Sequence, residues 1–317
     1  MQAMRQTRVL AFLLTSLASQ VHAWNSHVPL PPVPCQLYPT DNVWNANIAS
    51  LPVDAQSAAF VASIGGGSPL HPDFGSGKIG IPYAVVSATQ ALVPITFDPY
   101  GDESDPGPYP VPSDAPRERG SDRHVLIVQE DTLGQPCKLY ELFDARRKRR
   151  GAYWKAASGA FWDLGSNALR TVDFTSADAA GLPILPGLVR YDEILNGVIH
   201  HALRFTAPQT RKAYVWPARH FASSDSNSNL PPMGIRVRLK ASVDTSGFST
   251  TNQLLLTALK TYGMFLADHG GAWFVTGAPD PHWNNDDLHE LTSLHGDDFE
   301  AVDESSLIVD PDSGQVQ

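Results

Sequence analysis

Short runs of β-branched and aromatic residues, each closed by a cluster of turn residues, constrain this chain more than any other feature. The runs have the length and composition of strands, and the 26 prolines and 24 glycines of the chain supply the turns between them. They are HVLIVQ (124–129), CKLYELFDA (137–145), AYWKAASGAFWDL (152–164), HALRF (201–205), AYVWPA (213–218) and GIRVRLKA (234–241). We therefore predict a mainly β fold, an antiparallel β-sandwich or jelly roll with long loops.

One segment departs from the β pattern. In residues 250–266 apolar side chains recur at spacings of three and four, and Ser249 and its neighbours offer an N-cap. We predict a single helix there, packed on the sheet or closing one end of it. Residues 24–302 are predicted to form one β-sandwich domain, since sandwiches often exceed 200 residues, and residues 303–317 a flexible tail.

The first 23 residues have the pattern of a secretory signal peptide. Arg5 and Arg8 precede the apolar run 9–19, and Val21 and Ala23 are the small residues that signal peptidase accepts. No later window reaches the roughly 18 apolar residues of a membrane span. The sequence therefore predicts a secreted, extracellular protein that does not associate with membranes.

Two cysteines, Cys35 and Cys137, both follow the predicted cleavage site. In an oxidising compartment we expect them to form one disulfide that ties the N-terminal arm to the strand after Cys137. Two separate buried thiols are the alternative.

The charge of the chain limits its partners. The formal net charge of −10 disfavours binding to nucleic acid or anionic membranes, so we predict neither as a partner. The one basic run, residues 146–150, is interpreted as a solvated hairpin tip. Neutral glycans remain suitable partners, and we predict a monomer.

The sequence lacks an HExxH helix, a CxxC pair, a P-loop and a GxSxG elbow. We therefore predict no cofactor and no metal, although the local pairs His71 with Asp73 and His200 with His201 leave a metal site open. Adjacent strand residues point to opposite faces, which argues against the second pair. Acid and base chemistry by carboxylates, histidines, tyrosines and arginines remains.

Ionisable residues are densest in residues 183–220, among apolar and aromatic side chains, which is typical of a site. They are Arg190, Asp192, Glu193, His200, His201, Arg204, Arg219 and His220. The preceding long loop, residues 164–194, has apolar content that argues against disorder, and we predict that it forms a wall of the site. A second acidic group, Asp102, Glu103 and Asp105, lies in a loop rich in proline and glycine and is either a carboxylate cluster or an acidic surface loop.

Alternation along the predicted strands places His124, Glu141 and His201 on apolar faces. Three such residues on neighbouring strands can converge in a groove, whereas each alone is equally explained as a hydrogen-bonded core residue. We also predict that residues 201–205 and 214–219 are antiparallel neighbours, joined by a turn around Pro208. In that pairing His201 faces the groove and Arg204 forms a salt bridge outside.

The chain resembles a family of secreted microbial proteins for which no activity is established. The resemblance rests on LPGLVRYDE, HALRFT, YVWPARH and GMFLADHGGAWF and covers about residues 44–302. It carries over no catalytic residue. The likeness to jelly-roll enzymes and lectins of polysaccharide metabolism is one of architecture alone.

The leading hypothesis is a glycoside hydrolase that degrades a polysaccharide in a groove of the sandwich, with two carboxyl groups facing each other across the bond. The candidate catalytic residues are Glu141, His201, His124, Asp105 and Glu103. The candidate substrate-binding residues are Trp154, Trp216, Tyr214, Arg204, Arg219 and His220.

Two alternatives stay open. A polysaccharide lyase would use an arginine to neutralise a uronate and His201 or Tyr214 to take the proton. A secreted lectin or adhesin would hold a glycan on its aromatic side chains without cutting it. Convergence of several ionisable side chains in one pocket favours an enzyme over a lectin.

Overall fold

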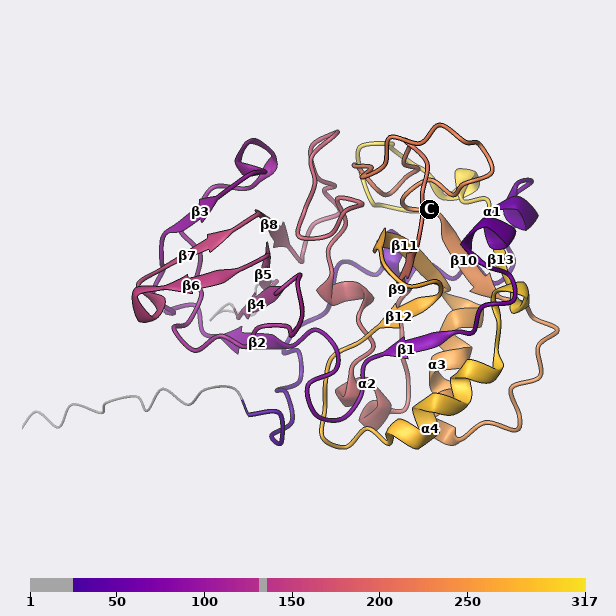
Figure 1. The fold of residues 1–317 in the computed structure, drawn as a ribbon, viewed down its shortest axis with the longest axis horizontal. Coiled ribbons are helices and arrows are strands. Elements are labelled where there is room, and N and C mark those ends of the chain that lie inside the picture. Colours follow the sequence, from indigo (N-terminus) through magenta and orange to yellow (C-terminus); the bar gives the residue numbers. More distant parts are fainter. Residues whose placement is uncertain (1–24, 131–135) are drawn as a thin grey trace, which may run out of the picture.

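The structure is a computed structural model that describes residues 25–130 and 136–317 (Figure 1). The predicted signal peptide lies outside the described residues. The helices are α1 (Ser57–Ile64), α2 (Tyr191–Asn196), α3 (Thr250–Thr261) and α4 (Asn285–His289), and short 3-10 turns are η1 (Val43–Asn45), η2 (Gly101–Glu103), η3 (Arg149–Gly151), η4 (Leu185–Gly187), η5 (Glu290–Ser293), η6 (Gly296–Asp298) and η7 (Ser305–Leu307). The strands are β1 (His71–Asp73), β2 (Tyr83–Val86), β3 (Ile95–Phe97), β4 (Val125–Gln129), β5 (Lys138–Phe143), β6 (Arg146–Lys148), β7 (Tyr153–Ala156), β8 (Ser158–Asp163), β9 (Leu203–Ala207), β10 (Arg236–Leu239), β11 (Met264–His269), β12 (Phe274–Thr276) and β13 (Phe299–Ala301).

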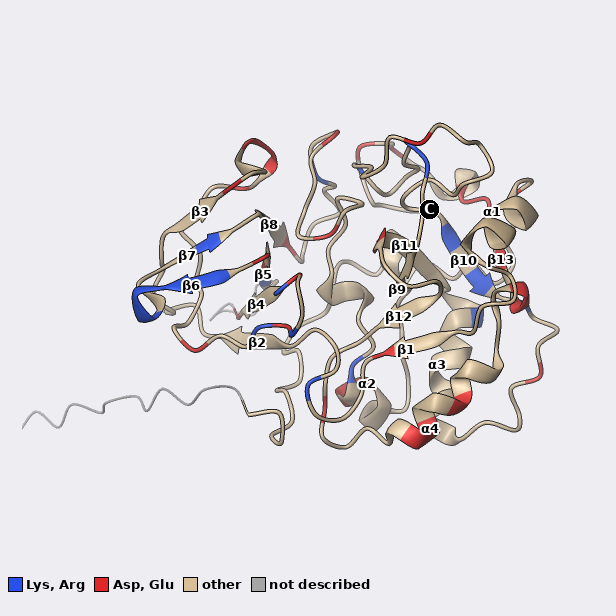
Figure 2. Ribbon diagram, viewed as in Figure 1, with Lys and Arg blue, Asp and Glu red and all other residues tan. Residues whose placement is uncertain are grey.

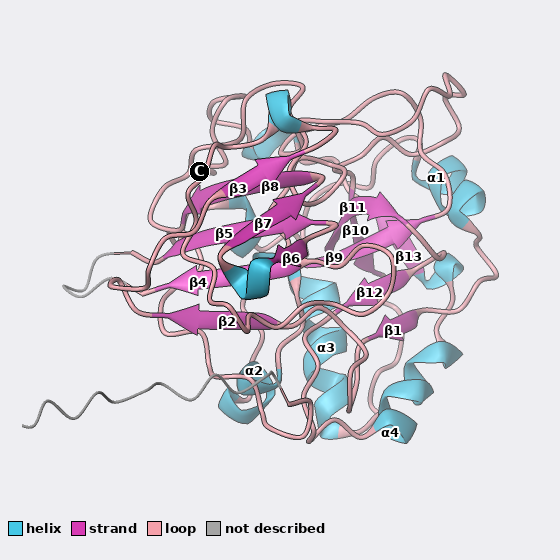
Figure 3. Cartoon of the chain, turned by 60° about the vertical axis from the view of Figure 1, so that its left-hand side comes forward, coloured by secondary structure: helices cyan, strands magenta, loops and turns pink. Residues whose placement is uncertain are grey.

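The strands form three sheets. The large sheet has the order β1-β12-β9-β11-β10-β13, the central sheet β2-β4-β5-β8 and the small sheet β3-β7-β6. The chain enters the large sheet with β1, builds the other two sheets, and returns to the large sheet from β9 onward (Figures 1 and 3). The β-rich prediction is confirmed. The antiparallel sandwich is not, because each sheet contains a parallel pair: β9 with β11, β2 with β4, and β3 with β7.

The central sheet is buried on both faces, as the alternation in β4 shows. Leu126 and Val128 point into the larger core, which continues into the large sheet, whereas Val125 and Ile127 point into a smaller core. Trp154 of β7 fills that smaller core from the small sheet. Consecutive apolar residues in β4 therefore serve two different cores, one on each side of the sheet.

The predicted helix is present but shorter than expected. Ser249 caps α3, since its Oγ accepts the backbone N–H of Asn252 at 3.1 Å. The helix ends at Thr261, and Gly263, whose φ is +64°, turns the chain so that β11 begins at Met264. In the sequence, the apolar pattern of the predicted helix continues past this turn to residue 266, because the first residues of β11 are also buried.

Residues 303–317, which were predicted as a flexible tail, make specific contacts with the rest of the described chain. Residues 308 and 316 form a β-bridge, and Gln315 bridges Asn42 near the start of the described chain. The Arg219 guanidinium donates to Pro311 O at 2.9 Å and pairs with Asp312 at 2.6 Å. Polar and backbone contacts of this kind fix the tail, and a hydropathy pattern does not reveal them.

The predicted pairing of residues 201–205 with 214–219 is wrong. Both edges of β9 are occupied, by β11 and by β12, so no edge is free for the second segment. Tyr214 instead bridges Met233, and the chain around it runs along the edge of a cavity. The 146–150 hairpin, by contrast, is confirmed as β6 and β7 with the turn η3 between them.

The disulfide between Cys35 and Cys137 is present and spans 102 residues. Replacing both cysteines with serine is expected to lower the free energy of unfolding by about 3–5 kcal/mol, because the unfolded chain regains the entropy of a long loop. Thermal unfolding with and without a reductant tests this. The reductant should destabilise the wild type and leave the double variant unchanged; equal melting temperatures of the two proteins would contradict the expectation.

Candidate functional site

A cavity of about 510 Å³ lies between the central sheet and the large sheet. Segments far apart in the chain meet there: the loop after β3, the ends of β5 and β8, the long loop before α2, the segment after β9, and β11. The lining residues are Tyr100, Phe143, Ser158, Thr175, Ser176, Ala177, Asp178, Ala179, Lys212, His220, Phe221, Ala222, Ser223, Ser224 and Asp268. The predicted wall, residues 164–194, thus contributes its middle part.

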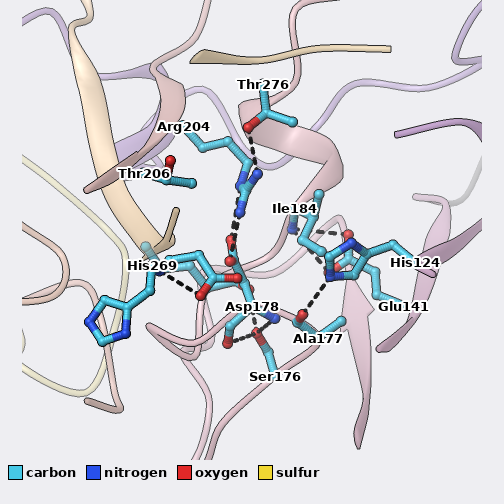
Figure 4. Close-up of polar contacts among 12 residues, drawn as sticks. His124, Glu141, Ser176, Ala177, Asp178, Ile184, Arg204, Thr206, His269 and Thr276 are labelled. Carbon is cyan, nitrogen blue, oxygen red and sulfur yellow. Dashed lines mark hydrogen bonds and ion pairs between the residues drawn. The ribbon is translucent and has the colours of Figure 1, made fainter. Parts of the chain in front are cut away.

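Behind this cavity lies a buried ion pair (Figure 4). Arg204 of β9 binds Asp178 in a bidentate manner, with Nε–Oδ2 and Nη2–Oδ1 distances of 3.0 and 2.7 Å. Its remaining nitrogen donates to the Thr276 hydroxyl at 2.6 Å. Arg204 was predicted to form a salt bridge on the outside, but only 3% of its surface is exposed. A charge at such depth requires the matched geometry that Asp178 provides.

A second ion pair adjoins the first. His124 lies 2.6 Å from Glu118 through Nδ1 and 3.0 Å from the carbonyl oxygen of Ala177 through Nε2. Burial lowers the pKa of His124, but the hydrogen bond and charge of Glu118 outweigh it and raise the pKa to about 9. His124 is therefore an imidazolium at neutral pH and holds the cavity wall at Ala177.

Asp268 reaches the cavity because of an irregularity in β11. The pairing of β11 with β9 shifts register between Leu266 and Asp268, and such a bulge re-aims the side chains that follow it. The Asp268 carboxylate accepts the backbone N–H of His269 at 2.7 Å. No other hydrogen bond to this carboxylate occurs among the described residues, so it is available to a ligand.

The electrostatics around Asp268 favour its protonated form. Burial raises its pKa to about 7, and Asp178 adds to the effect, while Arg204 and His124 oppose it. The cluster already pairs two cations with two anions, so an ionised Asp268 would add an unmatched charge. At neutral pH the cavity thus contains a carboxyl group poised to give or take a proton.

The opposite side of the cavity carries an imidazole and aromatic rings. His220 donates from Nδ1 to the Ala179 carbonyl at 2.7 Å, which leaves Nε2 on the side of Glu103, 3.8 Å away. The Phe221 ring lies nearly parallel to His220 and to Tyr214, with centroids 5.9 and 6.4 Å apart. Glu103 is itself oriented, since it accepts the backbone N–H of Thr175 at 3.0 Å.

Glu141 proves to be an anchor and not an accessible acid. Its carboxylate is fully buried and accepts the backbone N–H groups of Ile184 and Leu185 and the indole N–H of Trp162, at 2.9–3.1 Å. Burial raises its pKa to about 7 despite these donors. Glu141 is not among the residues that line the cavity, and its observed contacts fix the loop that forms the wall (Figure 4).

His201 does not join His124 and Glu141. It lies against a different cavity, between the N-terminal arm and α2, and its Nε2 is 2.8 Å from Glu193. Its other ring nitrogen donates to Ala202 O at 2.8 Å. The predicted convergence of the three residues is therefore wrong, although His124 and Glu141 both contact the same wall segment.

Several other predicted site residues have structural positions. Trp154 is 2% exposed within the smaller core and offers no face to a sugar ring. Trp216 donates to Ser313 O at 2.8 Å, and Arg219 binds the tail. Asp105 accepts from Phe161 N and Arg170, both at 2.7 Å, and thereby ties its loop to β8.

Of the predicted residues, His220 lines the cavity, Tyr214 and Glu103 adjoin it, and the others lie behind it or elsewhere. The residues that the sequence interpretation missed are Asp178, Asp268, Glu118 and Phe221. Asp268 carries the same kind of signal that identified His124. It is an ionisable residue in a strand, two positions from an apolar residue, here the buried Leu266. The apolar spacing of the predicted helix continues to residue 266 and so obscures the strand that contains Asp268.

Comparisons of the chain with protein-family models, curated proteins and solved structures find no match. Function must therefore be argued from the site. In residues 25–130 and 136–317, no three His, Cys, Asp or Glu side chains are grouped in a way that could hold a metal ion. Within the same residues, no helix is long and apolar enough to cross a membrane.

Replacing Glu141 with Gln is expected to destabilise the protein by about 1–3 kcal/mol, because the amide NH2 group would face buried N–H donors that now share a carboxylate. Urea unfolding measures this. The exposed Glu290→Gln variant serves as the control and should unfold like the wild type. An unchanged Glu141→Gln protein would remove the anchoring role.

The raised pKa of Asp268 makes a prediction about stability. Between its unfolded pKa of about 4 and its folded pKa of about 7, the native state holds a proton that the unfolded state releases, so Asp268 lowers stability as the pH rises. The Asp268→Asn variant lacks this titration. It should gain stability relative to the wild type as the pH rises from about 4 to about 7, whereas exposed Asp297→Asn should not. A constant difference across this range would contradict the raised pKa.

Proposed function

We propose that this chain is a secreted polysaccharide-degrading enzyme, a glycoside hydrolase, whose active site is the cavity at Asp268. The observation that carries the proposal is a cavity-lining carboxyl group with a pKa raised to about 7 and an oxygen free for a ligand. The predicted signal peptide and the disulfide support an extracellular setting. The proposed groove lies between the central and large sheets, and we take the central and small sheets, which pack against each other, as the sandwich-like part.

In this proposal Asp268 is the general acid. A carboxyl group that is largely protonated near neutral pH can donate its proton to the glycosidic oxygen as the bond breaks. Arg204 and His124 then lower the cost of the anion that remains, because both cations lie close enough to shift the pKa of Asp268. Asp178 cannot take this role, since both of its oxygens are bound to Arg204.

Glu103 is the proposed second carboxylate. The Thr175 N–H orients it, and it lies beside His220 at the cavity edge. A separation of about 5 Å between the two carboxyl groups in the complex gives retention, and about 6.5–9.5 Å leaves space for a water and gives inversion. The parallel rings of Phe221 and Tyr214 provide flat apolar faces of the kind on which sugar rings stack.

A lectin or adhesin is the second candidate function, and the same aromatic rings favour it. A lectin, however, has no need for a carboxyl group with a raised pKa. The lyase alternative is weakened because Arg204 is fully engaged with Asp178 and Thr276 and cannot neutralise a substrate carboxylate. Of its two proposed bases, His201 lies at another cavity, whereas Tyr214 adjoins this one.

The test is the Asp268→Asn variant assayed for release of reducing ends across a panel of polysaccharides. We expect its rate to fall by at least about 100-fold, because the general acid is lost while the shape of the site is kept. The wild-type rate should decline above about pH 7 as Asp268 ionises. Glu103→Gln should likewise lose activity, and Asp297→Asn is the matched control.

Two outcomes would contradict the proposal. Unchanged activity of Asp268→Asn would remove Asp268 from the mechanism. Glycan binding by the wild type, without cleavage of any polysaccharide that it binds, would make the lectin the better assignment.

A further inference from the structure

The β6–β7 hairpin gathers six basic side chains in a protein whose formal net charge is −10. One of them, Arg147, donates to Ser113 O at 2.6 Å. We call Arg146, Lys148, Arg149, Arg150 and Lys155 the basic tip. Figure 2 shows basic residues concentrated at the end of β6, on the side of the molecule away from the large sheet. Four of the five are exposed, and Lys148 is partly exposed.

Strand register brings these charges onto one surface. Arg146 lies directly opposite Lys155 in the β6–β7 pair, so the two side chains share a face, and Lys148 lies two residues from Arg146 on that same face. The other face of β7 carries Trp154, which is buried in the smaller core. Like charges directly opposite one another destabilise a strand pair, and Arg146 and Lys155 nevertheless occupy such opposed positions.

Few anions compensate the basic tip. Arg146 binds Asp144 at 3.0 Å. Among the described residues, no hydrogen bond or ion pair involves the side chain of Lys148, Arg149, Arg150 or Lys155. These four cations are therefore available to an external anion.

The backbone of the turn adds a second observation. Arg149 and Arg150 have φ angles of +43° and +59°. These values lie in the left-handed region, which residues other than Gly, Asn and Asp seldom adopt. Gly151 follows with φ +96° and packs against Ser113, which fixes the base of the turn. The turn thus holds two arginines where asparagine or glycine would fit with less strain. Charged side chains protect an edge strand such as β6 from aggregation, but that protection does not require arginines at the two left-handed positions of the turn.

We propose that the basic tip is a docking site for an anionic polysaccharide, separate from the cavity at Asp268. Arginine forks bind carboxylate and sulfate groups with paired hydrogen bonds, and a flexible chain can reach the tip without approaching the acidic remainder of the protein. A bilayer is disfavoured, because none of the exposed large apolar side chains belongs to the β6–β7 turn. A nucleic acid duplex is disfavoured because its extended charge would face the acidic body.

The experiment measures binding of the full chain to heparin and to polygalacturonate at low ionic strength. The tip variant is Arg149→Asn, Arg150→Asn and Lys155→Gln, in which asparagine tolerates the backbone of the turn. The control is Lys78→Gln, Arg119→Gln and Lys138→Gln, which removes the same charge from exposed positions elsewhere. We expect the tip variant to bind at least about tenfold more weakly, the control to bind like the wild type, and added salt to weaken binding.

The outcomes separate this site from the proposed catalytic one. Asp268→Asn should bind both polysaccharides like the wild type, even where cleavage is lost. Absence of wild-type binding to either polysaccharide, or equal weakening in the tip variant and the control, would overturn the docking site. Tighter binding to duplex DNA or to vesicles containing phosphatidylserine than to both polysaccharides would overturn the choice of partner.

Discussion

The Arg204–Asp178 pair joins the large sheet to the loop that covers it, and the rest of the site depends on this contact. Both side chains are almost fully buried, so each charge is tolerable only in the presence of the other. Arg204 comes from β9, the strand between β11 and β12, and Asp178 comes from a stretch without regular structure. The pair therefore gives a long loop a fixed position relative to the sheet.

The central sheet holds the same loop from the other side. Glu141 of β5 binds the backbone at Ile184 and Leu185, and His124, next to β4, binds the backbone at Ala177. Both residues lie on the face directed toward the large sheet. Three buried ionisable side chains thus hold this loop in place. Glu141 and His124 bind its backbone, and Arg204 binds Asp178. Much of what looked like a catalytic constellation in the sequence performs this structural task.

The sequence predicted features whose causes are local. Alternation identified β4 and β5 and their buried faces, Ser249 identified the start of α3, and the two cysteines identified the disulfide. The density of ionisable residues correctly directed attention to the loop before α2 and to His220. Apart from the disulfide, which joins residues 102 positions apart and was inferred because the chain has only two cysteines, these signals lie within a few residues of the feature they predict.

The failures concern contacts between distant parts of the chain. The two neighbours of β9 come from residues 264–276, some 60 residues later, and no local pattern reports a pairing of that kind. An arginine on a strand gives no indication of whether Asp178 will meet it in the interior. Glu141 shows the same difficulty, because an acid on an apolar face is explained equally well by catalysis and by backbone donors that appear only in the fold.

The irregularity in β11 implies that the position of the acid is set by a count of residues. Leu266 and Asp268 face consecutive partners on β9, Phe205 and Thr206, with Ala267 as the additional residue between them. A regular ladder with all residues retained would instead pair Ala267 with Thr206 and place the Asp268 carboxyl group on the other face of the sheet. In this strand, the register of pairing carries chemical information that a list of residue types does not contain.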